Sequence, residues 1–286
     1  MEVKRKIKRV AAIHDLSGFG RCSLTVIIPI LSAMGVQVCP IPTAVLSTHT
    51  GGFDNMVFND LTDHISPCYA HYKSLDVEFD VIYSGFLASA KQIDGCLEFF
   101  RGYPNALKVV DPVMGDNGKP YKTYTPELCE RMGELVSIAD IITPNLTEAV
   151  ILLGENYSPI FDTKVLSDRL HCLSKRLGGA GDVVITGAHT EYENYCCNIG
   201  FSRRQGELCC VEYEHLPVHY PGTGDIFTSV FIGELLRLGE TNGGGDFETA
   251  IKRATSFAQK AVEVTYANSG VCRNGVMFEP LLRELM

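Results

Sequence analysis

Residues 108–145, KVVDPVMGDNGKPYKTYTPELCERMGELVSIADIITPN, decide the fold. The stretch begins with a short β-branched run at residues 108–110 and ends with another at residues 141–142. Between them, residues 126–138 carry apolar side chains at intervals of three and four, as an amphipathic helix requires. Two apolar strands joined through a helix predict a crossover between parallel neighbours of one sheet.

The same alternation runs through most of the chain. Further strands are expected at residues 10–13, 37–41, 81–83 and 183–185, and further helices at residues 24–33, 93–101 and 164–177. Two later runs, 195–201 and 208–213, flank a turn-like segment at 202–206 and predict an antiparallel hairpin. No long linker or internal repeat divides the chain. We therefore expect one α/β domain over residues 1–286, with a mostly parallel sheet between two layers of helices and the hairpin added in the C-terminal half.

Charge and hydropathy exclude several classes of protein. Asp and Glu number 34 against 25 Lys and Arg, which gives a net charge of −9. Phosphate backbones and anionic lipids repel a negative chain, so we expect no nucleic-acid partner and no membrane partner. The first apolar stretch is broken at His14 and Asp15, too early for a signal-peptide core, and no later run could span a bilayer. These features predict a cytoplasmic protein.

The chain contains 11 cysteines, without the spacing of a disulfide framework or a zinc module. The pairs Cys196-Cys197 and Cys209-Cys210 could hold zinc if all four thiolates converged. Neighbouring residues of a strand point to opposite faces, however, so one such pair does not easily bind one ion. We therefore expect free, packed thiols, as in a reducing compartment.

Polar or small residues follow each expected strand. They are His14-Asp15, Ser84-Gly85, Asp111-Pro112, Thr143-Pro144-Asn145 and Thr186-Gly187. In open α/β sheets, ligands bind in the crevice outside the carboxyl ends of the strands. These residues are therefore expected to surround one site.

The motif PGTGD at residues 221–225 precedes a helical pattern. Free backbone N–H groups at a helix N-terminus bind anions, and glycines let a phosphate approach the main chain closely. Asp225 would lie in the first helical turn, either as a stabilising charge or as the base that accepts an alcohol proton in phosphoryl transfer. The anion site beside it favours the second interpretation.

A second motif, TPNLTE at residues 143–148, carries Asn145 and Glu148 three residues apart. At this spacing both side chains share one helix face and could point at one Mg²⁺ ion, which prefers oxygen ligands. The same pattern is typical of a capping box, and this alternative stays open. Asp111 adds a carboxylate at another strand end, and the turn-rich segment Asp116-Asn117-Gly118-Lys119 is long enough to fold over a ligand.

Together and in this order, DPVMGDNGK (111–119), TPNLTE and PGTGD resemble motifs of the ribokinase superfamily, and the resemblance covers essentially the whole chain. STHT (47–50), SGFL (84–87) and DPVMG (111–115) are similar to segments of pyridoxal kinases. The resemblance implies a three-layer ribokinase-like fold and an enzyme that uses Mg²⁺ and ATP to phosphorylate the 5′-hydroxymethyl group of a B6 vitamer. It also implies a homodimer.

The resemblance assigns roles residue by residue. Asp225 would be the base, with Gly222, Thr223 and Gly224 as the anion hole. The vitamin would contact Asp15, Ser17, Thr43, Ser47, His49, Thr50 and Phe86. ATP would contact Asp111, Asn145, Glu148, Thr186, Gly187, Thr223 and Lys119, and the metal ion would lie at Asp111 and Glu148.

Asp15 departs from the pattern, because pyridoxal kinases usually carry a serine near this position. The segment Asp15-Leu16-Ser17-Gly18 is also similar to hydroxymethylpyrimidine kinases of thiamine synthesis, which form the first alternative, although many of them carry Cys in place of Asp225. A non-catalytic binder on the same fold is the second alternative, and the intact Asp225 argues against it. A dinucleotide fingerprint would need Gly or Ala where Ser23 stands, and no P-loop motif is present.

Overall fold

The structure is a computed structural model that describes residues 7–121, 123–158, 163–176, 181–189, 195–203, 205–242, 246–268 and 272–286. A nine-stranded sheet runs through it in the order β11-β10-β9-β8-β5-β4-β1-β2-β3. Its strands are β1 (Arg9–Phe19), β2 (Gln37–Thr48), β3 (Phe58–Asp60), β4 (Val81–Ser84), β5 (Leu107–Val110), β8 (Ile141–Ile142), β9 (Asp182–His189), β10 (Tyr195–Ser202) and β11 (Glu207–Glu214).

Strand direction follows the prediction. The pairs between β2, β1, β4, β5, β8 and β9 are all parallel. The β9–β10 and β10–β11 pairs are antiparallel, which confirms the hairpin in the C-terminal half, and β3 adds a short antiparallel edge to β2. A mostly parallel sheet with its connections made through helices is thus confirmed.

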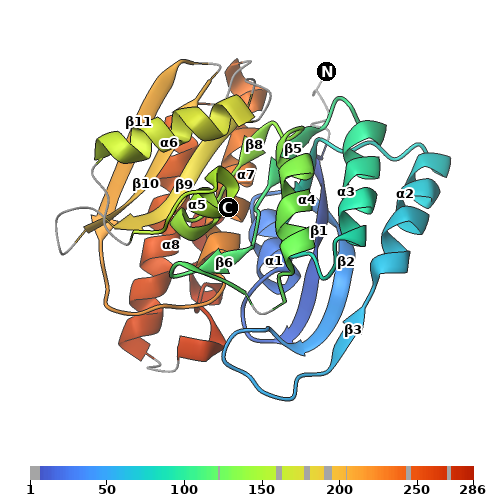
Figure 1. Cartoon of the computed structure of the whole chain (residues 1–286), viewed down its shortest axis with the longest axis horizontal. Helices are drawn as coiled ribbons and strands as arrows, with labels where there is room; N and C mark the ends of the chain where they lie inside the picture. The colour runs from blue at the N-terminus through green and yellow to red at the C-terminus, as the bar shows by residue number, and fades with distance from the viewer. Residues whose placement is uncertain are drawn as a thin grey trace.

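Helices cover both faces of the sheet (Figure 1). On one face lie α2 (Ile65–Ser74), α3 (Lys91–Gly102), α4 (Pro126–Val136), α5 (Leu146–Leu153) and α6 (Thr163–Arg176). On the other lie α1 (Leu24–Ala33), α7 (Thr223–Asn242), α8 (Phe247–Asn268) and the 3₁₀ segment η3 (Glu279–Leu285). Two further 3₁₀ segments are η1 (Thr62–His64) and η2 (Cys272–Asn274).

The alternation of side chains along each strand builds the two cores. In β1, Ala11 and Ile13 join the cluster under α3 and α4, whereas Val10 and Ala12 join the cluster under α1 and α7. Successive strand residues point to opposite faces, so a strand covered on both sides has to be apolar throughout. This is why the strands appear in the sequence as short continuous apolar runs.

The first two strands are longer than predicted. β1 continues to Phe19 and β2 to Thr48, with a register shift between His14 and Leu16. The expectation that His14 follows the strand is therefore wrong. His14 lies inside β1, is fully buried, and packs against the ring of Tyr83 at 4.3 Å between centroids. Burial lowers the pKa of His14 to about 3, so its ring is neutral.

Two helices were not predicted from the sequence, and both bury few large apolar side chains. α2 buries only Ile65 among its ten residues. The buried side of α8 is made largely of small residues such as Ala250, Ala254 and Ala261. The predicted helix end at Leu177 lies outside the described residues. Among the described helices, none combines the length and the apolar composition needed to cross a membrane.

Candidate active site

One large cavity, of about 680 Å³, opens where the parallel strands end. Residues that follow or end β1, β4, β5, β8 and β9 line it, as the sequence analysis expected. The cavity brings together most of the predicted site residues. They are Asp15, His49, Thr50, Phe86, Asp111, Asn145, Glu148, Thr186, Gly187, Gly222, Thr223, Gly224 and Asp225.

Four predicted site residues lie outside this lining. Ser17 supports it from behind, because its Oγ donates to Asp15 Oδ2 at 2.7 Å. Thr43 is buried and donates to the Phe86 carbonyl at 2.9 Å, whereas the Ser47 Oγ accepts from the backbone N–H of Val57. Lys119 is exposed on the small second sheet.

The loop before α7 is shaped by glycine. Gly222 has a φ of 84°, and a Cβ at this position would lie 2.0 Å from the carbonyl oxygen of Arg21. The loop therefore packs directly on the backbone that enters α1. The first N–H groups of a helix have no acceptor within that helix, so the start of α7 at Thr223 presents donors to the cavity. This end can hold an anion.

Asp225 lies in the first turn of α7 and is held by the backbone at the start of α1. The backbone N–H of Ser23 donates to Asp225 Oδ2 at 2.7 Å. Burial raises the pKa of Asp225 to about 7, the Ser23 hydrogen bond opposes this rise, and the negative charge of Asp15 adds to it. A carboxyl group with a pKa near neutral can accept a proton and release it again.

The carboxyl groups that line the cavity raise one another's pKa values. Burial raises the pKa of Asp111 well above its usual value, and the charges of Glu148 and Asp225 raise it further. Asp15 acts on Asp225 in the same way. Several buried acids held this close are stabilised by a cation between them.

The start of α5 settles the geometry of the second motif. Asn145 caps the helix by accepting from the backbone N–H of Glu148 at 3.0 Å, and Glu148 Oε2 accepts from the backbone N–H of Asn145 at 2.8 Å. The predicted capping box is thus present. Glu148 also accepts from the Met114 N–H at 3.0 Å, so each of its oxygens accepts a backbone hydrogen bond. Burial raises its pKa to about 7 against these hydrogen bonds.

These contacts suit Mg²⁺, with different roles for Asp111 and Glu148. Asp111 is a buried carboxyl group whose charge is disfavoured by its acidic neighbours, and it is suited to bind the ion directly. Glu148 uses both oxygens on the backbone and is suited to hold a metal-bound water. Capping and metal support are therefore compatible roles for Glu148.

Replacing Glu148 with Gln is expected to raise the Mg²⁺ concentration needed for half-maximal rate several-fold, in the range of about 10-fold seen for outer ligand partners. The variant loses the negative charge that favours the hydrated ion. The test is a Mg²⁺ titration of the initial rate at fixed ATP. Thr125→Ala is the matched control, because it removes the N-cap of α4, away from the cavity. An unchanged titration would reduce Glu148 to a helix cap.

One end of the cavity is built by β9 and β10. The backbone N–H of Gly187 donates to Asn198 Oδ1 at 2.9 Å, and Asn198 Nδ2 donates to Thr255 Oγ1 of α8. Thr186 bridges to Asn145 at the start of α5. Asn198 lies in the middle of a strand without a motif around it, so sequence reasoning missed it.

The other end is aromatic and polar. His49 Nε2 lies 2.7 Å from the carbonyl oxygen of Arg273, and its Nδ1 accepts from the Gly51 N–H at 3.1 Å. The ring therefore carries its proton on Nε2. Phe86 and Asp15 line the same end of the cavity. A flat polar heteroaromatic ring is the kind of ligand that such a lining suits.

The segment expected to fold over a ligand forms a small hairpin of β6 (Gly115–Asp116) and β7 (Lys119–Pro120). Its turn residues Asn117 and Gly118 both have positive φ. Asp116 and Asn117 line the cavity, whereas Lys119 does not. His219 Nε2 lies 3.0 Å from Asp116 Oδ2, so the hairpin contacts the segment before α7.

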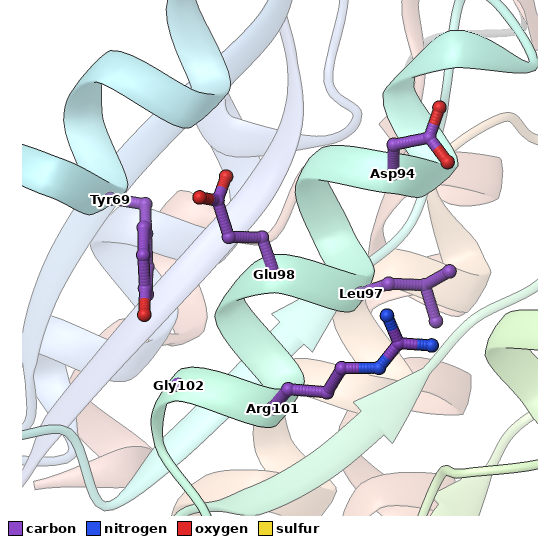
Figure 2. Close-up of a pocket in the computed structure, with 6 residues that line it drawn as sticks. All are labelled: Tyr69, Asp94, Leu97, Glu98, Arg101 and Gly102. Carbon is purple, nitrogen blue, oxygen red and sulfur yellow. The ribbon is translucent and has the colours of Figure 1, made fainter.

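A smaller cavity of about 390 Å³ lies between α2 and α3 (Figure 2). Tyr69 lines one side, and Asp94, Leu97, Glu98, Arg101 and Gly102 of α3 line the other. Its carboxyl group at Asp94 already pairs with Arg131 at 2.6 Å. It lacks a helix N-terminus and clustered buried acids, so the larger cavity is the candidate active site.

Comparison with known proteins identifies the family. A sequence model described as phosphomethylpyrimidine kinase matches residues 28–274. The chain belongs to the phosphomethylpyrimidine kinase family. Members of this family are kinases.

Similar solved structures include pyridoxal kinases. A protein from Bacteroides thetaiotaomicron, named after phosphomethylpyrimidine kinases, was crystallised with pyridoxal; it is 41% identical, has a TM-score of 0.90, and the match covers 98% of this chain and 96% of that one. Pyridoxal kinase from Lactobacillus plantarum is 30% identical, with a TM-score of 0.87 and coverage of 98% and 97%. The ribokinase-like fold is thereby confirmed.

A pyridoxal kinase is also found among the curated relatives, at lower sequence identity. A pyridoxal kinase of Deinococcus radiodurans is 25% identical over 247 residues, which are 81% of this chain and 80% of that protein. Family membership and these likenesses confirm the resemblance to pyridoxal kinases that DPVMG, TPNLTE and PGTGD indicated.

Proposed function

We propose that this kinase transfers the terminal phosphoryl group of ATP to the 5′-hydroxymethyl group of a B6 vitamer, namely pyridoxal, pyridoxamine or pyridoxine. The observation that carries the proposal is Asp225, which lies in a single cavity between the aromatic end at His49 and Phe86 and the end at Thr186 and Gly187. Asp225 lines the cavity and accepts a hydrogen bond from the Ser23 N–H. Its pKa of about 7 suits a general base.

The roles follow from what each group can do. The Ser23 N–H holds one oxygen of Asp225 and leaves the other to accept the hydroxymethyl proton. The N–H groups of Gly222 to Gly224 at the start of α7 receive the negative charge of the transferred phosphoryl group. Asp111 would bind Mg²⁺ directly, and Glu148 would bind it through water. When bound, Mg²⁺ neutralises charge on the ATP phosphates.

ATP is proposed to lie along Thr186, Gly187, Asn145 and Thr223, with the β6–β7 hairpin closing over it. Closure would exclude water and limit ATP hydrolysis. The vitamin ring is proposed to lie between His49 and Phe86, beside Asp15. The homodimer stays a prediction.

Hydroxymethylpyrimidine is the second candidate acceptor, because the matching family model bears its name. The two acceptors share a flat ring with a hydroxymethyl group, so the same catalytic groups serve both. Two observations favour the vitamin. The similar Bacteroides protein was crystallised with pyridoxal, and this chain carries Asp225 where many hydroxymethylpyrimidine kinases carry Cys.

The deciding measurement is ADP release from Mg-ATP with pyridoxal, pyridoxamine, pyridoxine, hydroxymethylpyrimidine and ribose as separate acceptors. We expect turnover with a B6 vitamer and its loss in the Asp225→Asn protein. Preference for hydroxymethylpyrimidine would move the chain to the second function. Turnover with none of the five would contradict both.

A further inference from the structure

Three metal-binding side chains that have no role in the proposed reaction meet at the end of the cavity built by β9 and β10. Cys196 Sγ lies 3.5 Å from His189 Nδ1 and 3.5 Å from His215 Nδ1. All three ligand atoms lie within 4.8 Å of one another, and the imidazole rings are 4.7 Å apart between centroids. Within the described part of the chain, this is the one group of His, Cys, Asp and Glu side chains gathered so closely.

Strand register brings the three residues together. His189 ends β9 and lies directly opposite Cys196 of β10 in the antiparallel ladder. Cys196 in turn lies opposite Tyr213 of β11, and His215 follows two residues later. Opposite and diagonal residues on one face of a sheet are within side-chain reach. Two strand pairings therefore position the group, and neither pairing depends on the residues at 190–194, which lie outside the described residues.

The distances match tetrahedral zinc coordination. Zn–S bonds of about 2.3 Å and Zn–N bonds of about 2.0 Å at a tetrahedral angle put sulfur and nitrogen about 3.5 Å apart. Both sulfur–nitrogen distances have this value. The two imidazole nitrogens would need to lie about 3.3 Å apart for the same geometry. They are already within 4.8 Å, so small rotations of the two half-buried rings complete the arrangement.

We propose that His189, Cys196 and His215 bind a borderline-soft divalent ion, Zn²⁺ in the first place, with a fourth coordination position turned toward the cavity. One thiolate and two imidazoles are ligands that Zn²⁺ prefers and Mg²⁺ avoids. The site is therefore separate in chemistry from the oxygen-lined region of Asp111 and Glu148. All three residues line the cavity, so a bound ion is reachable from it. The inference does not rest on the proposed reaction.

Core packing accounts for Cys197 and Cys209 but not for Cys196. Cys197 points to the opposite face of β10 and joins the apolar core under α6, and Cys209 packs against the core under α8. The two cysteine pairs thus do not converge on one ion, which agrees with the strand argument made from the sequence. Cys196 alone of the four faces two imidazoles.

The test is metal titration of the full-length, tag-free protein after reduction and removal of metals with a chelator. Co²⁺ is the probe, because it replaces Zn²⁺ and reports its ligands. We expect one Co²⁺ per chain, a thiolate-to-cobalt charge-transfer band and the intense visible bands of a tetrahedral ion. Zn²⁺ should remove these bands with submicromolar affinity, whereas excess Mg²⁺ should leave them unchanged.

Two variants test the ligands separately. Cys196→Ser should abolish the charge-transfer band, and His215→Ala should weaken Zn²⁺ binding by about 100-fold, roughly the share of one ligand in a structural zinc site. Cys210→Ser is the control, since this exposed neighbour lies outside the cavity lining and should leave the spectrum intact. Circular dichroism establishes that each variant is folded. A wild-type spectrum without the thiolate band, or one that survives in Cys196→Ser, would overturn the proposal.

Discussion

Replacing Asp225 with Asn is expected to lower turnover by about two or more orders of magnitude while ATP affinity stays nearly unchanged. The amide keeps the shape of the side chain and can still accept the hydrogen bond from the Ser23 N–H. It cannot take the proton of the substrate hydroxyl group. The loss should therefore fall on kcat, because the groups proposed to bind ATP are untouched.

The measurement is steady-state ADP release together with nucleotide binding by calorimetry. Asp63→Asn is the matched control, since it removes an exposed carboxylate that pairs with Lys91 at the surface. Its turnover should equal that of the wild type. Turnover of the Asp225→Asn protein near the wild-type value would remove Asp225 from the mechanism.

The same variant should be more stable than the wild type at high pH. The folded pKa of about 7 lies above the ordinary Asp value of 3.8, so the folded state holds this proton more tightly than the unfolded state does. Stability from Asp225 is therefore present at low pH and is lost as the pH rises through about 7. Asn carries no charge and avoids this loss.

The expected gain for Asp225→Asn is roughly 2 kcal/mol above neutral pH and close to zero near about pH 4, after allowance for solvent access to the cavity. Urea unfolding at a series of pH values measures it. A difference between the two proteins that does not vary with pH would show that the Asp225 carboxyl group is not destabilised by burial. An active-site charge of this kind exchanges stability for activity.

Replacing Gly222 with Ala should lower the free energy of unfolding by about 3 kcal/mol and abolish activity. A methyl group at this position meets the Arg21 carbonyl oxygen at 2.0 Å, and the φ of 84° is strained for any residue with a side chain. The clash pushes the start of α7 away from the loop before α1. The Ser23 contact to Asp225 joins these two segments and would be lost with it.

Two other glycines separate the causes of this effect. Gly206 has a φ of 69° with no atom within 4 Å of an added Cβ, so Gly206→Ala measures backbone strain alone and should cost about 1 kcal/mol. Gly224 is the second residue of α7, and a Cβ added there would make an ordinary contact, 3.8 Å from Asp111 Oδ2. Gly224→Ala should leave the unfolding free energy nearly unchanged. Equal losses for Gly222→Ala and Gly206→Ala would remove the close approach to Arg21 from the argument.

Predictions from the sequence succeeded for elements that are specified by neighbouring residues in the chain. Residues 141–142 and 24–33 were predicted with the bounds that the structure shows, because apolar runs and helical spacing are local properties. The capping box at Asn145 and Glu148 was visible in TPNLTE for the same reason. The extension of β1 through His14 and Asp15 was not, since a polar pair in an apolar run normally ends a strand. Pairing with β2 keeps these residues in the sheet.

The sequence by itself determined the parallel sheet, the hairpin at its end and the list of acids that meet in the cavity. These features depend on residue type and on spacing along the chain, and both can be read directly from the sequence. Tertiary structure alone decided that Ser23, with no motif of its own, holds Asp225, and that Cys196 faces His189 and His215 and not its neighbouring cysteines. Both contacts join segments that lie far apart in the sequence. Strand register and loop packing bring these segments together, and both depend on many residues at once.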